Sequence, residues 1–248
     1  MMGARFDLLY GAAMSGTPIP FAWDVWEPNW AHWVRRLLPL RLPLVVVTSA
    51  MSADYLRSRL GTTVECLPEA TTLSHYQRGG SLGERGVDIL ELGRRYSVWH
   101  DAVVAETSRR GLVHLYQQGP DQLIFPSQSD MVAGLSRAKI SVCFPSSITH
   151  PERSGRVATM THRYLESMAS RCLMVGTAPV ELVELMGYNP VVEADLSRPW
   201  DQIAEILATI ESYQPQVDEA YDRLRTVGDW SVRVAGLMHR IEDVVLPR

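Results

Sequence analysis

Short apolar segments without polar alternation recur along the chain, and amphipathic stretches separate them. The clearest segment, Leu44-Val45-Val46-Val47-Thr48, is rich in β-branched residues, as a strand buried on both faces of a sheet should be. An amphipathic stretch over 49–60 follows it, with Ser52 as the expected N-cap and Gly61 as the stop, and then a brief strand over 64–68. Strand, helix and strand in this order predict a parallel α/β sheet with right-handed crossovers.

The same alternation continues to the end of the sequence. We expect an earlier strand over 6–10 and later strands over 87–92, 112–116, 140–144, 173–175 and 191–192. The expected helices cover 99–109, 130–138, 159–169, 180–185 and 200–212, and a long helical region follows over 216–245. About five strand-helix repeats predict a Rossmann-like sheet.

A polar, glycine-rich stretch divides these two series. The sequence Gln-Arg-Gly-Gly-Ser-Leu-Gly at 77–83 is the best linker candidate. We therefore predict two lobes: a first lobe over 1–76 and, after a linker over 77–83, a Rossmann-like domain over 84–248.

Composition excludes several classes of protein. Hydrophobic residues make up 46% and charged residues 21% of the 248, which is ordinary globular usage and argues against disorder or a coiled coil. A net charge of -4 disfavours binding to the phosphate backbone of nucleic acid. No GxGxxG motif and no GxxxxGK[ST] loop is present, so a bound nucleotide must be held by other means.

The cysteines and apolar runs predict the compartment. Cys66, Cys143 and Cys172 have neither CxxC nor Cys/His spacing, so they indicate neither a disulfide framework nor a zinc site, and no metal or cofactor is expected. No segment approaches the roughly 18 uninterrupted apolar residues of a spanning helix. We expect a cytoplasmic protein.

The segment over 140–180 carries most of the polar side chains that suggest chemistry. A buried strand ends at Pro145-Ser146-Ser147, a polar loop follows, and the next helix presents Arg163 and Glu166. The loop would lie at the carboxyl ends of parallel strands, where α/β sheets bind ligands. Arginines beside a helix N-terminus suit a diphosphate, and a carboxylate can accept two hydrogen bonds from a ribose diol.

These residues resemble the donor-site signature of retaining glycosyltransferases with the GT-B fold, of the E-x7-E type. The likeness rests on Phe144-Pro145-Ser146-Ser147, on Tyr164-Leu165-Glu166-Ser167-Met168-Ala169-Ser170 and on the apolar strand 172–177. Glu91-Leu92-Gly93-Arg94-Arg95 is similar to the strand end that opens the family's C-terminal domain. Asp229-Trp230-Ser231 is similar to the start of the family's closing helix, and Thr48-Ser49 and Leu67-Pro68-Glu69-Ala70 to a passage of its first lobe.

The resemblance implies a GT-B arrangement of two lobes and a role for each candidate residue. The implied donor-binding residues are Glu166, Arg94, Arg153, Arg156, Arg163, Ser146 and His150, and the implied catalytic candidates are Glu152 and Asp24.

The sequence departs from the family pattern at three places. Only about 75 residues precede the linker, so the resemblance implies a partial N-terminal lobe over 1–76 and a complete Rossmann-like domain over 84–248 that ends in the closing helix. The first glutamate of E-x7-E would fall at Ala158, so Glu152 is its nearest candidate. The family's diphosphate-binding lysine has no counterpart near Trp99 and His100, so one of the arginines would replace it.

Tryptophans cluster in the short first lobe. Trp23, Trp26, Trp30 and Trp33 are spaced by 3, 4 and 3, which would place them on one helical face. We favour a core or lobe-interface cluster over an acceptor platform or dimer face. We also expect the region to complete its surface against a second copy or a partner subunit. Arg35, Arg36 and Arg41 leave a peripheral contact with an anionic membrane open.

The leading functional prediction is transfer of a sugar from a nucleotide-sugar donor to an unknown acceptor, with retention. One alternative is a non-catalytic glycosyltransferase-like subunit that binds a nucleotide sugar or a partner enzyme. Another is a different enzyme on the same scaffold, such as a nucleotide-sugar epimerase.

Overall fold

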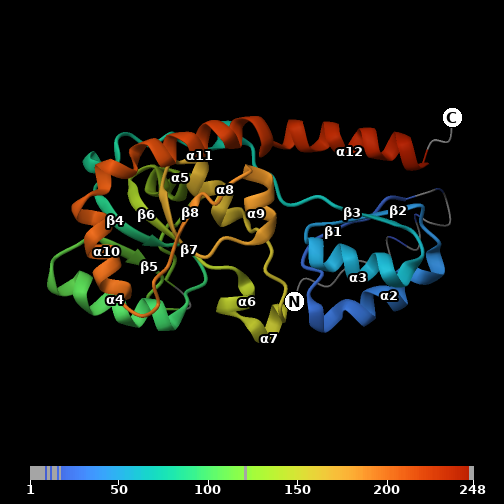
Figure 1. Cartoon of the computed structure of the whole chain (residues 1–248), viewed down its shortest axis with the longest axis horizontal. Coiled ribbons are helices and arrows are strands. Elements are labelled where there is room, and N and C mark those ends of the chain that lie inside the picture. Colours follow the sequence, from blue (N-terminus) through green and yellow to red (C-terminus); the bar gives the residue numbers. More distant parts are fainter. Residues whose placement is uncertain (1–8, 10–11, 13–15, 17, 120–121, 246–248) are drawn as a thin grey trace.

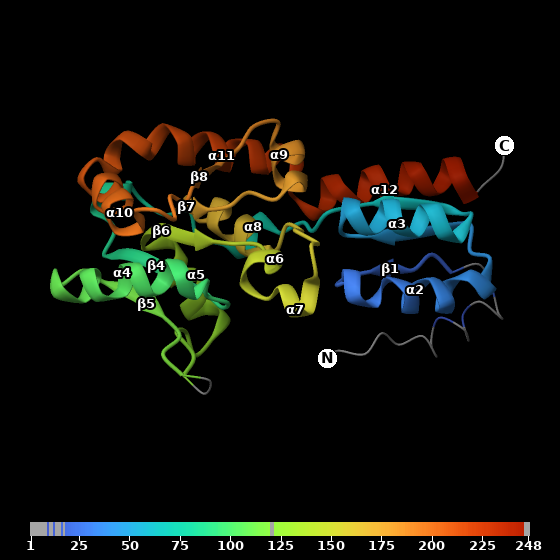
Figure 2. The same ribbon diagram turned by 60° about the horizontal axis from the view of Figure 1, so that its bottom comes forward.

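The computed structural model describes residues 9, 12, 16, 18–119 and 122–245 (Figure 1). The strand expected over 6–10 falls outside these residues except for Leu9. Two parallel sheets lie side by side along the long axis of the molecule, and each is covered by helices (Figures 1 and 2).

The first sheet has the strand order β1-β2-β3, with β1 at Phe21–Ala22, β2 at Leu44–Val47 and β3 at Thr63–Cys66. Both pairings are parallel. Helices α2 (Trp30–Leu37) and α3 (Ala50–Leu60) follow β1 and β2, and their apolar side chains pack on Val45 and Val47. Gly61 ends α3 with φ +63°, as expected.

The second sheet has the order β5-β4-β6-β7-β8, again with all pairings parallel. Its strands are β4 (Val87–Glu91), β5 (His114–Tyr116), β6 (Ala138–Cys143), β7 (Leu173–Gly176) and β8 (Val191–Glu193). Its helices are α4 (Ser97–Arg109), α5 (Gln128–Ser136), α6 (Ser146–Thr149), α7 (Pro151–Ser154), α8 (His162–Ala169), α9 (Val180–Met186) and α10 (Pro199–Ala208). The expected α/β class is confirmed, because strands and helices alternate and every strand pair is parallel.

Helices cover both faces of the second sheet. Ile89 of β4 and Ile140 of β6 pack with α4 and α10 on one face. Met174 of β7 packs with α8, α9 and α11 (Gln214–Val227) on the other. The central strands β4, β6 and β7 are almost wholly buried, which explains their mainly apolar sequences, whereas the edge strands β5 and β8 are more exposed.

The last helix, α12 (Trp230–Val245), returns to the first sheet. It contacts β2, and Arg240 forms an ion pair with Glu65 of β3 (Figure 1). The helical region expected over 216–245 consists of two helices, because Gly228 and Asp229 separate α11 from α12. The Asp229 carboxylate accepts a backbone hydrogen bond from Ser231 at 2.9 Å, which satisfies an N–H at the start of the new helix.

Two further local predictions are wrong. Ser52 lies inside α3 rather than at its N-cap, and its hydroxyl donates to the Val25 carbonyl at 2.6 Å. The four tryptophans do not share a helical face, because Trp23 and Trp26 precede α2. Trp26 is buried, whereas Trp23 is 47% exposed. Pro28 lies in the short 3-10 helix Glu27–Asn29, which keeps α2 from starting earlier.

Hydrogen bonds hold the glycine-rich segment 77–83 against the second sheet's helices. The Gly79 carbonyl accepts from Arg171 at 2.7 Å, and the Leu82 amide donates to Gln214 at 2.9 Å. An added Cβ at Gly79 would lie 2.5 Å from the Ser136 carbonyl oxygen. The glycine is therefore used for a close approach of two backbones.

Candidate functional site

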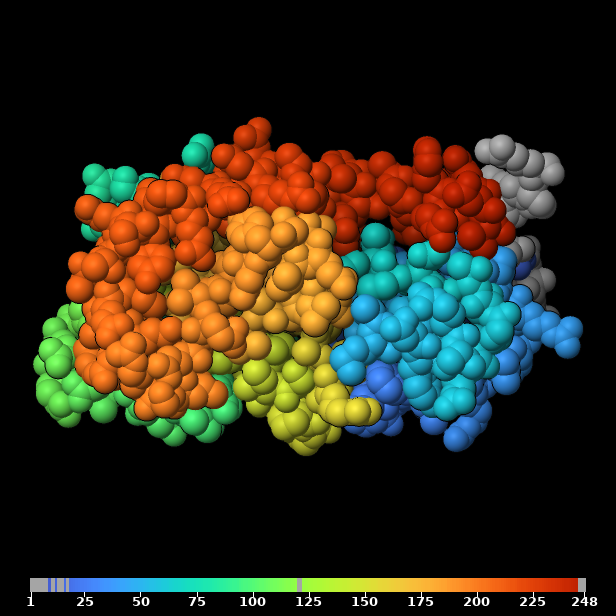
Figure 3. Space-filling model, viewed as in Figure 1, coloured from blue at the N-terminus to red at the C-terminus, as the bar shows by residue number. Residues whose placement is uncertain are grey.

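Loops from the carboxyl ends of the two sheets meet at the boundary between the lobes, and we refer to this boundary as the cleft. The loop after β2 meets the loop before α8, where the Thr159 hydroxyl donates to the Thr48 carbonyl at 3.3 Å. The start of α3 meets α9, where the Ala50 amide donates to Glu181 at 3.1 Å. Figure 3 shows the segment around residue 150 in direct contact with the first lobe. Parallel sheets bind ligands beyond their carboxyl ends, so this cleft is the candidate site.

Arg163 and Glu166 of α8 line the second-sheet side of the cleft. The Arg163 Nε donates to Glu166 Oε2 at 3.4 Å, and the Tyr76 hydroxyl donates to Glu166 Oε1 at 3.3 Å. Both contacts are long and leave acceptor capacity on the carboxylate. The Glu166 side chain is 12% exposed, so it is accessible to a ligand without being a surface residue.

The Arg163 guanidinium is a cation with incomplete pairing. Its Nη1 is buried and has no hydrogen-bond partner among the described residues. Burial lowers the pKa of Arg163, and Glu166 partly opposes this effect. Such a group should attract an anion that offers further acceptors.

Gly93 lets Arg163 approach the end of β4. Its φ is +86°, and a Cβ at this position would lie 3.2 Å from Arg163 Nη2. Arg94 follows directly, with only part of its side chain covered. Burial lowers the pKa of Arg94, as does the neighbouring Arg153, while Asp24 and Glu69 raise it. The structure thus brings Arg94, Arg153 and Arg163 to the same cleft.

Asp24 reaches the cleft from the end of β1. Its φ of +56° is one of the few positive values at a residue other than glycine, and Asp tolerates it better than most residues. Arg153 of α7 lies 3.5 Å from its carboxylate, with both side chains more than half exposed. Such an exposed pair is worth about 0–1 kcal/mol, so a charged ligand can replace it.

Arg156 is engaged differently from the other arginines. Its Nε donates to Glu27 at 2.9 Å, and its backbone amide donates to the same carboxylate at 2.7 Å. The side-chain hydrogen bond from Arg156 is the main cause that lowers the pKa of Glu27. Arg156 therefore links the two lobes rather than pointing an unpaired charge into the cleft.

The remaining candidates lie on the short helices after β6. Ser146 is fully buried at the start of α6, and its hydroxyl has no hydrogen-bond partner among the described residues. His150, between α6 and α7, likewise has a buried Nδ1 without a described partner. Glu152 is exposed on α7. The roles of all nine candidates stay predictions.

Sequence analysis missed a carboxylate from the first lobe. Glu69, in the loop after β3, lies 3.5 Å from His162 Nε2 at the start of α8. Burial raises the pKa of Glu69, while His162 lowers it and Asp24 raises it. Glu69 could have been proposed from the sequence, because it directly follows a predicted strand and belongs to the passage 67–70 that is similar to the family.

An open apolar pocket adjoins this group of charges. It has a volume of about 390 Å³, and its walls come from the end of β4, the end of β5 and the segment 123–131. The apolar lining residues are Leu92, Leu123, Ile124, Phe125, Pro126 and Met131. Gly93 belongs to both the pocket and the arginine cluster, so one ligand can occupy the two together. Another pocket, of about 520 Å³, lies along α10, where Arg198 is already paired with Glu205.

Comparisons with known proteins support this fold. No family model matches the chain, and no curated protein matches it by sequence. By structure, the chain is similar to sucrose-phosphate synthase from Thermosynechococcus elongatus, with a TM-score of 0.58 and 14% identity over 86% of this chain and 61% of that one. It thus spans about three fifths of that protein.

Two further solved structures resemble the chain to a comparable degree. Anabaena HepE in complex with UDP has a TM-score of 0.65 and 11% identity over 96% of this chain and 77% of that one. The UDP-forming α,α-trehalose-phosphate synthase from Burkholderia vietnamiensis has a TM-score of 0.59 and 12% identity over 88% and 65%. These likenesses confirm the expected fold class: the chain has a GT-B fold with a short first lobe. At these identities they establish the fold and no more.

None of the helices in the described part of the chain combines the length and apolar character needed to cross a lipid bilayer.

Proposed function

We propose that the chain is a glycosyltransferase that binds a nucleotide sugar in the cleft between its two sheets and transfers the sugar to an acceptor with retention. The observation that carries the proposal is the buried Nη1 of Arg163, which has no partner in the described part of the chain and lies beside Gly93 at the mouth of an apolar pocket. The diphosphate of a nucleotide would bind the guanidinium, and its base would occupy the pocket. Sucrose-phosphate synthase, HepE and trehalose-phosphate synthase, which have similar folds, support the choice of reaction.

The diphosphate would lie at the carboxyl end of β4. Arg163 supplies a guanidinium, Arg94 a second one, and Gly93 exposes backbone that a phosphate can approach closely. These arginines take the place of the lysine that the family pattern would supply. As the bond to the sugar breaks, negative charge grows on the diphosphate, so these groups act on the transition state.

The nucleoside would occupy the neighbouring apolar pocket. Leu92, Ile124 and Phe125 provide walls for a planar base, and the Glu166 carboxylate would accept the ribose hydroxyls. Hydrogen bonds from Tyr76 and Arg163 fix the orientation of Glu166.

The acceptor would enter from the first-lobe side, between the loops that carry Asp24 and Glu69. Both carboxylates lie across the cleft from the arginines, near the expected place of the sugar. Closing the two lobes around donor and acceptor would exclude water and hold the acceptor hydroxyl against the anomeric carbon. Asp24 is our catalytic candidate on this side, and exposed Glu152 is the candidate from the second lobe. The first 76 residues would then form an acceptor-side lobe and residues 84–248 the donor-side domain.

One observation favours the alternative of binding without transfer. Arg156 and Glu27 tie the lobes together through three hydrogen bonds in addition to the backbone contact at Arg156, which would restrict their opening for an acceptor. The chain would then bind the nucleotide sugar as a subunit of a larger assembly.

A donor panel tests the proposal. UDP-, GDP- and ADP-sugars would be screened by thermal shift, and the best donor would be followed by calorimetry and by a sugar-release assay. Glu166→Gln should weaken the donor by about tenfold or more, since a hydrogen bond to a charged group is worth about 1.5–3 kcal/mol. Glu219→Gln, exposed on α11, is the matched control and should bind like the parent.

The results distinguish a glycosyltransferase from a subunit that binds the donor without transferring the sugar. Donor binding with release of the sugar supports the enzyme, and donor binding without release or transfer supports the subunit. If none of the donors binds at millimolar concentration to folded protein, both are wrong.

A further inference from the structure

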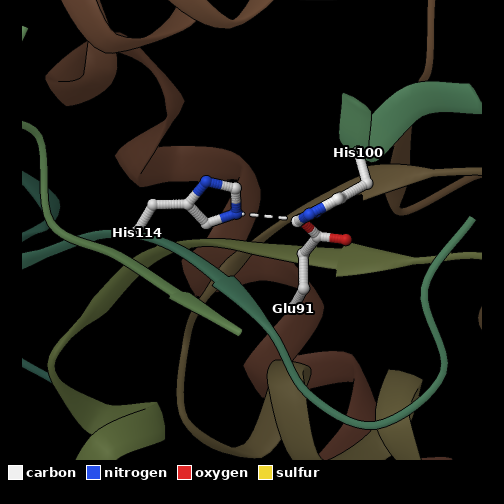
Figure 4. Close-up of side chains that lie close together, drawn as sticks. All are labelled: Glu91, His100 and His114. Atoms are coloured by element: carbon white, nitrogen blue, oxygen red, sulfur yellow. Dashed lines mark hydrogen bonds and ion pairs between the residues drawn. The ribbon is translucent and has the colours of Figure 1, made fainter. Parts of the chain in front are cut away.

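A buried cluster of two histidines and a glutamate lies beneath α4, apart from the side chains of the cleft. Glu91 is the last residue of β4, His100 lies in the first turn of α4, and His114 is the first residue of β5. The three side chains converge between the sheet and the helix (Figure 4). Their side chains are 2%, 8% and 3% exposed.

One carboxylate oxygen joins the two rings. Glu91 Oε1 lies 2.6 Å from His100 Nδ1 and 2.8 Å from His114 Nε2. The three ligand atoms all lie within 4.8 Å of one another, and this is the one such group among the residues that the structure describes. Burial would raise the pKa of Glu91, but hydrogen bonds from the two histidines outweigh it and hold the pKa below the usual value.

The ring nitrogens that face away from Glu91 have different neighbours. His114 Nδ1 lies 3.1 Å from the Thr107 hydroxyl oxygen, and that hydroxyl donates to the Val104 carbonyl at 2.9 Å. The Thr107 oxygen is therefore oriented to accept a hydrogen bond from the ring. His100 Nε2 lies 3.1 Å from Arg95 Nη1, whose side chain is exposed and also lies over the Tyr116 ring.

We propose that Glu91, His100 and His114 bind a divalent transition-metal ion, zinc in the first instance, through Glu91 Oε1, His100 Nδ1 and His114 Nε2. Two imidazoles and one carboxylate form a donor set that suits Zn²⁺ and leave a fourth position for water. The proposal goes beyond the proposed function, since no residue of the cluster is assigned to the donor or the acceptor.

The geometry allows this with small movements. Zinc binds nitrogen and oxygen ligands at about 2.0–2.2 Å, so Glu91 Oε1, which now lies 2.6 Å and 2.8 Å from the two ring nitrogens, would have to draw back from them to admit the ion. Each imidazole keeps one proton: it moves from Nδ1 to Nε2 in His100 and from Nε2 to Nδ1 in His114. The relocated His114 proton then points at the Thr107 oxygen, which is the outer hydrogen bond that metal-bound histidines usually make.

Arg95 must move when the metal binds. With its proton on Nε2, the His100 ring can no longer accept from Arg95, and the exposed guanidinium turns away toward solvent or Tyr116. The metal would also join β4, α4 and β5 at the base of the loop that carries Gly93 and Arg94, and so stiffen that loop.

Metal titration of the full chain tests the proposal. After treatment with a chelator, the protein would be titrated with Zn²⁺ by calorimetry, and Co²⁺ would report a nitrogen-oxygen site by its visible spectrum. We expect one ion per chain with a dissociation constant below about 1 µM, and a higher melting temperature with zinc.

Substitutions that keep the hydrogen bonds but remove the metal ligands make the test specific. His100→Gln and His114→Gln retain an amide that can donate to Glu91, so the fold should persist while zinc affinity falls on the order of 100-fold. Thr107→Val should lower it about tenfold through the His114 ring. His239→Gln, exposed on α12, is the matched control.

Two results would overturn the proposal. If the folded parent protein takes up no stoichiometric zinc, the cluster is a self-contained hydrogen-bond network. If zinc binds but both histidine variants, shown to be folded by circular dichroism, bind it equally well, the ion lies elsewhere. Neither result bears on the donor panel, because the readout is metal binding rather than transfer.

Discussion

Replacing Arg163 with methionine isolates the contribution of one guanidinium to the proposed phosphate site. Methionine fills a similar buried volume without a charge. Among the described residues Nη1 has no acceptor to lose, and the contact of Nε with Glu166 is long, at 3.4 Å. The cost to folding should therefore be small, because removing an incompletely paired buried cation also removes its desolvation cost.

The cost to ligand binding should be large and selective. A charged hydrogen bond to phosphate is worth about 1.5–3 kcal/mol, which corresponds to about 10- to 100-fold in affinity. Calorimetry on Arg163→Met should show this loss for the nucleoside diphosphate of the best donor. The matching nucleoside has no phosphate and should lose about threefold or less.

A control defines the result that would refute this reasoning. Arg198→Met removes an arginine that pairs with Glu205 on α10, away from the cleft, and should leave both affinities unchanged. Equal losses for nucleoside and nucleoside diphosphate in Arg163→Met would show that Arg163 supports the pocket as a whole. No loss for either would remove it from the site.

Three further outcomes follow from the packing. Burial raises the pKa of Glu181, so the folded state holds its proton more tightly than the unfolded state. The unfolding free energy should therefore fall as pH rises above 4.5, the ordinary pKa of a glutamate. Urea titrations of Glu181→Gln should show a weaker dependence of this free energy on pH, whereas the exposed Glu184→Gln should behave like the parent protein. Gly176→Ala would place a Cβ 1.9 Å from a backbone oxygen of β6 and should cost about 3 kcal/mol in the same assay; a loss below about 1 kcal/mol would contradict it. Gly134→Ala would push the Phe125 ring, 2.2 Å away, into the pocket and weaken the nucleoside about tenfold, and an unchanged affinity would argue against a base there.

The strand segments could be predicted from the sequence because they are buried on both faces. Leu44–Val47 and Leu173–Gly176 need apolar side chains on either side, so their character is visible without knowing what packs against them. The position of Arg163 and Glu166 was readable for a similar reason, since residues three apart share one helical face. Local periodicity and the motif around them were enough to single out these two residues as candidates for a donor site, which stays a prediction.

Contacts between residues far apart in the sequence were decided by the tertiary structure. Arg156 looked like a phosphate ligand in sequence, yet folding brings Glu27, 129 positions away, to its side chain and its backbone amide. Ser52 looked like a helix cap, but it meets the Val25 carbonyl inside α3.

The histidine cluster shows most clearly that sequence alone does not predict which distant side chains meet. Glu91, His100 and His114 have no ligand spacing in the sequence, because β4, α4 and β5 each contribute one side chain. Sequence alone determined which segments are strands and which helix carries charge, since those properties depend on near neighbours. Which charges meet was decided by the fold, because the right-handed crossovers between parallel strands bring side chains from separate elements to one place.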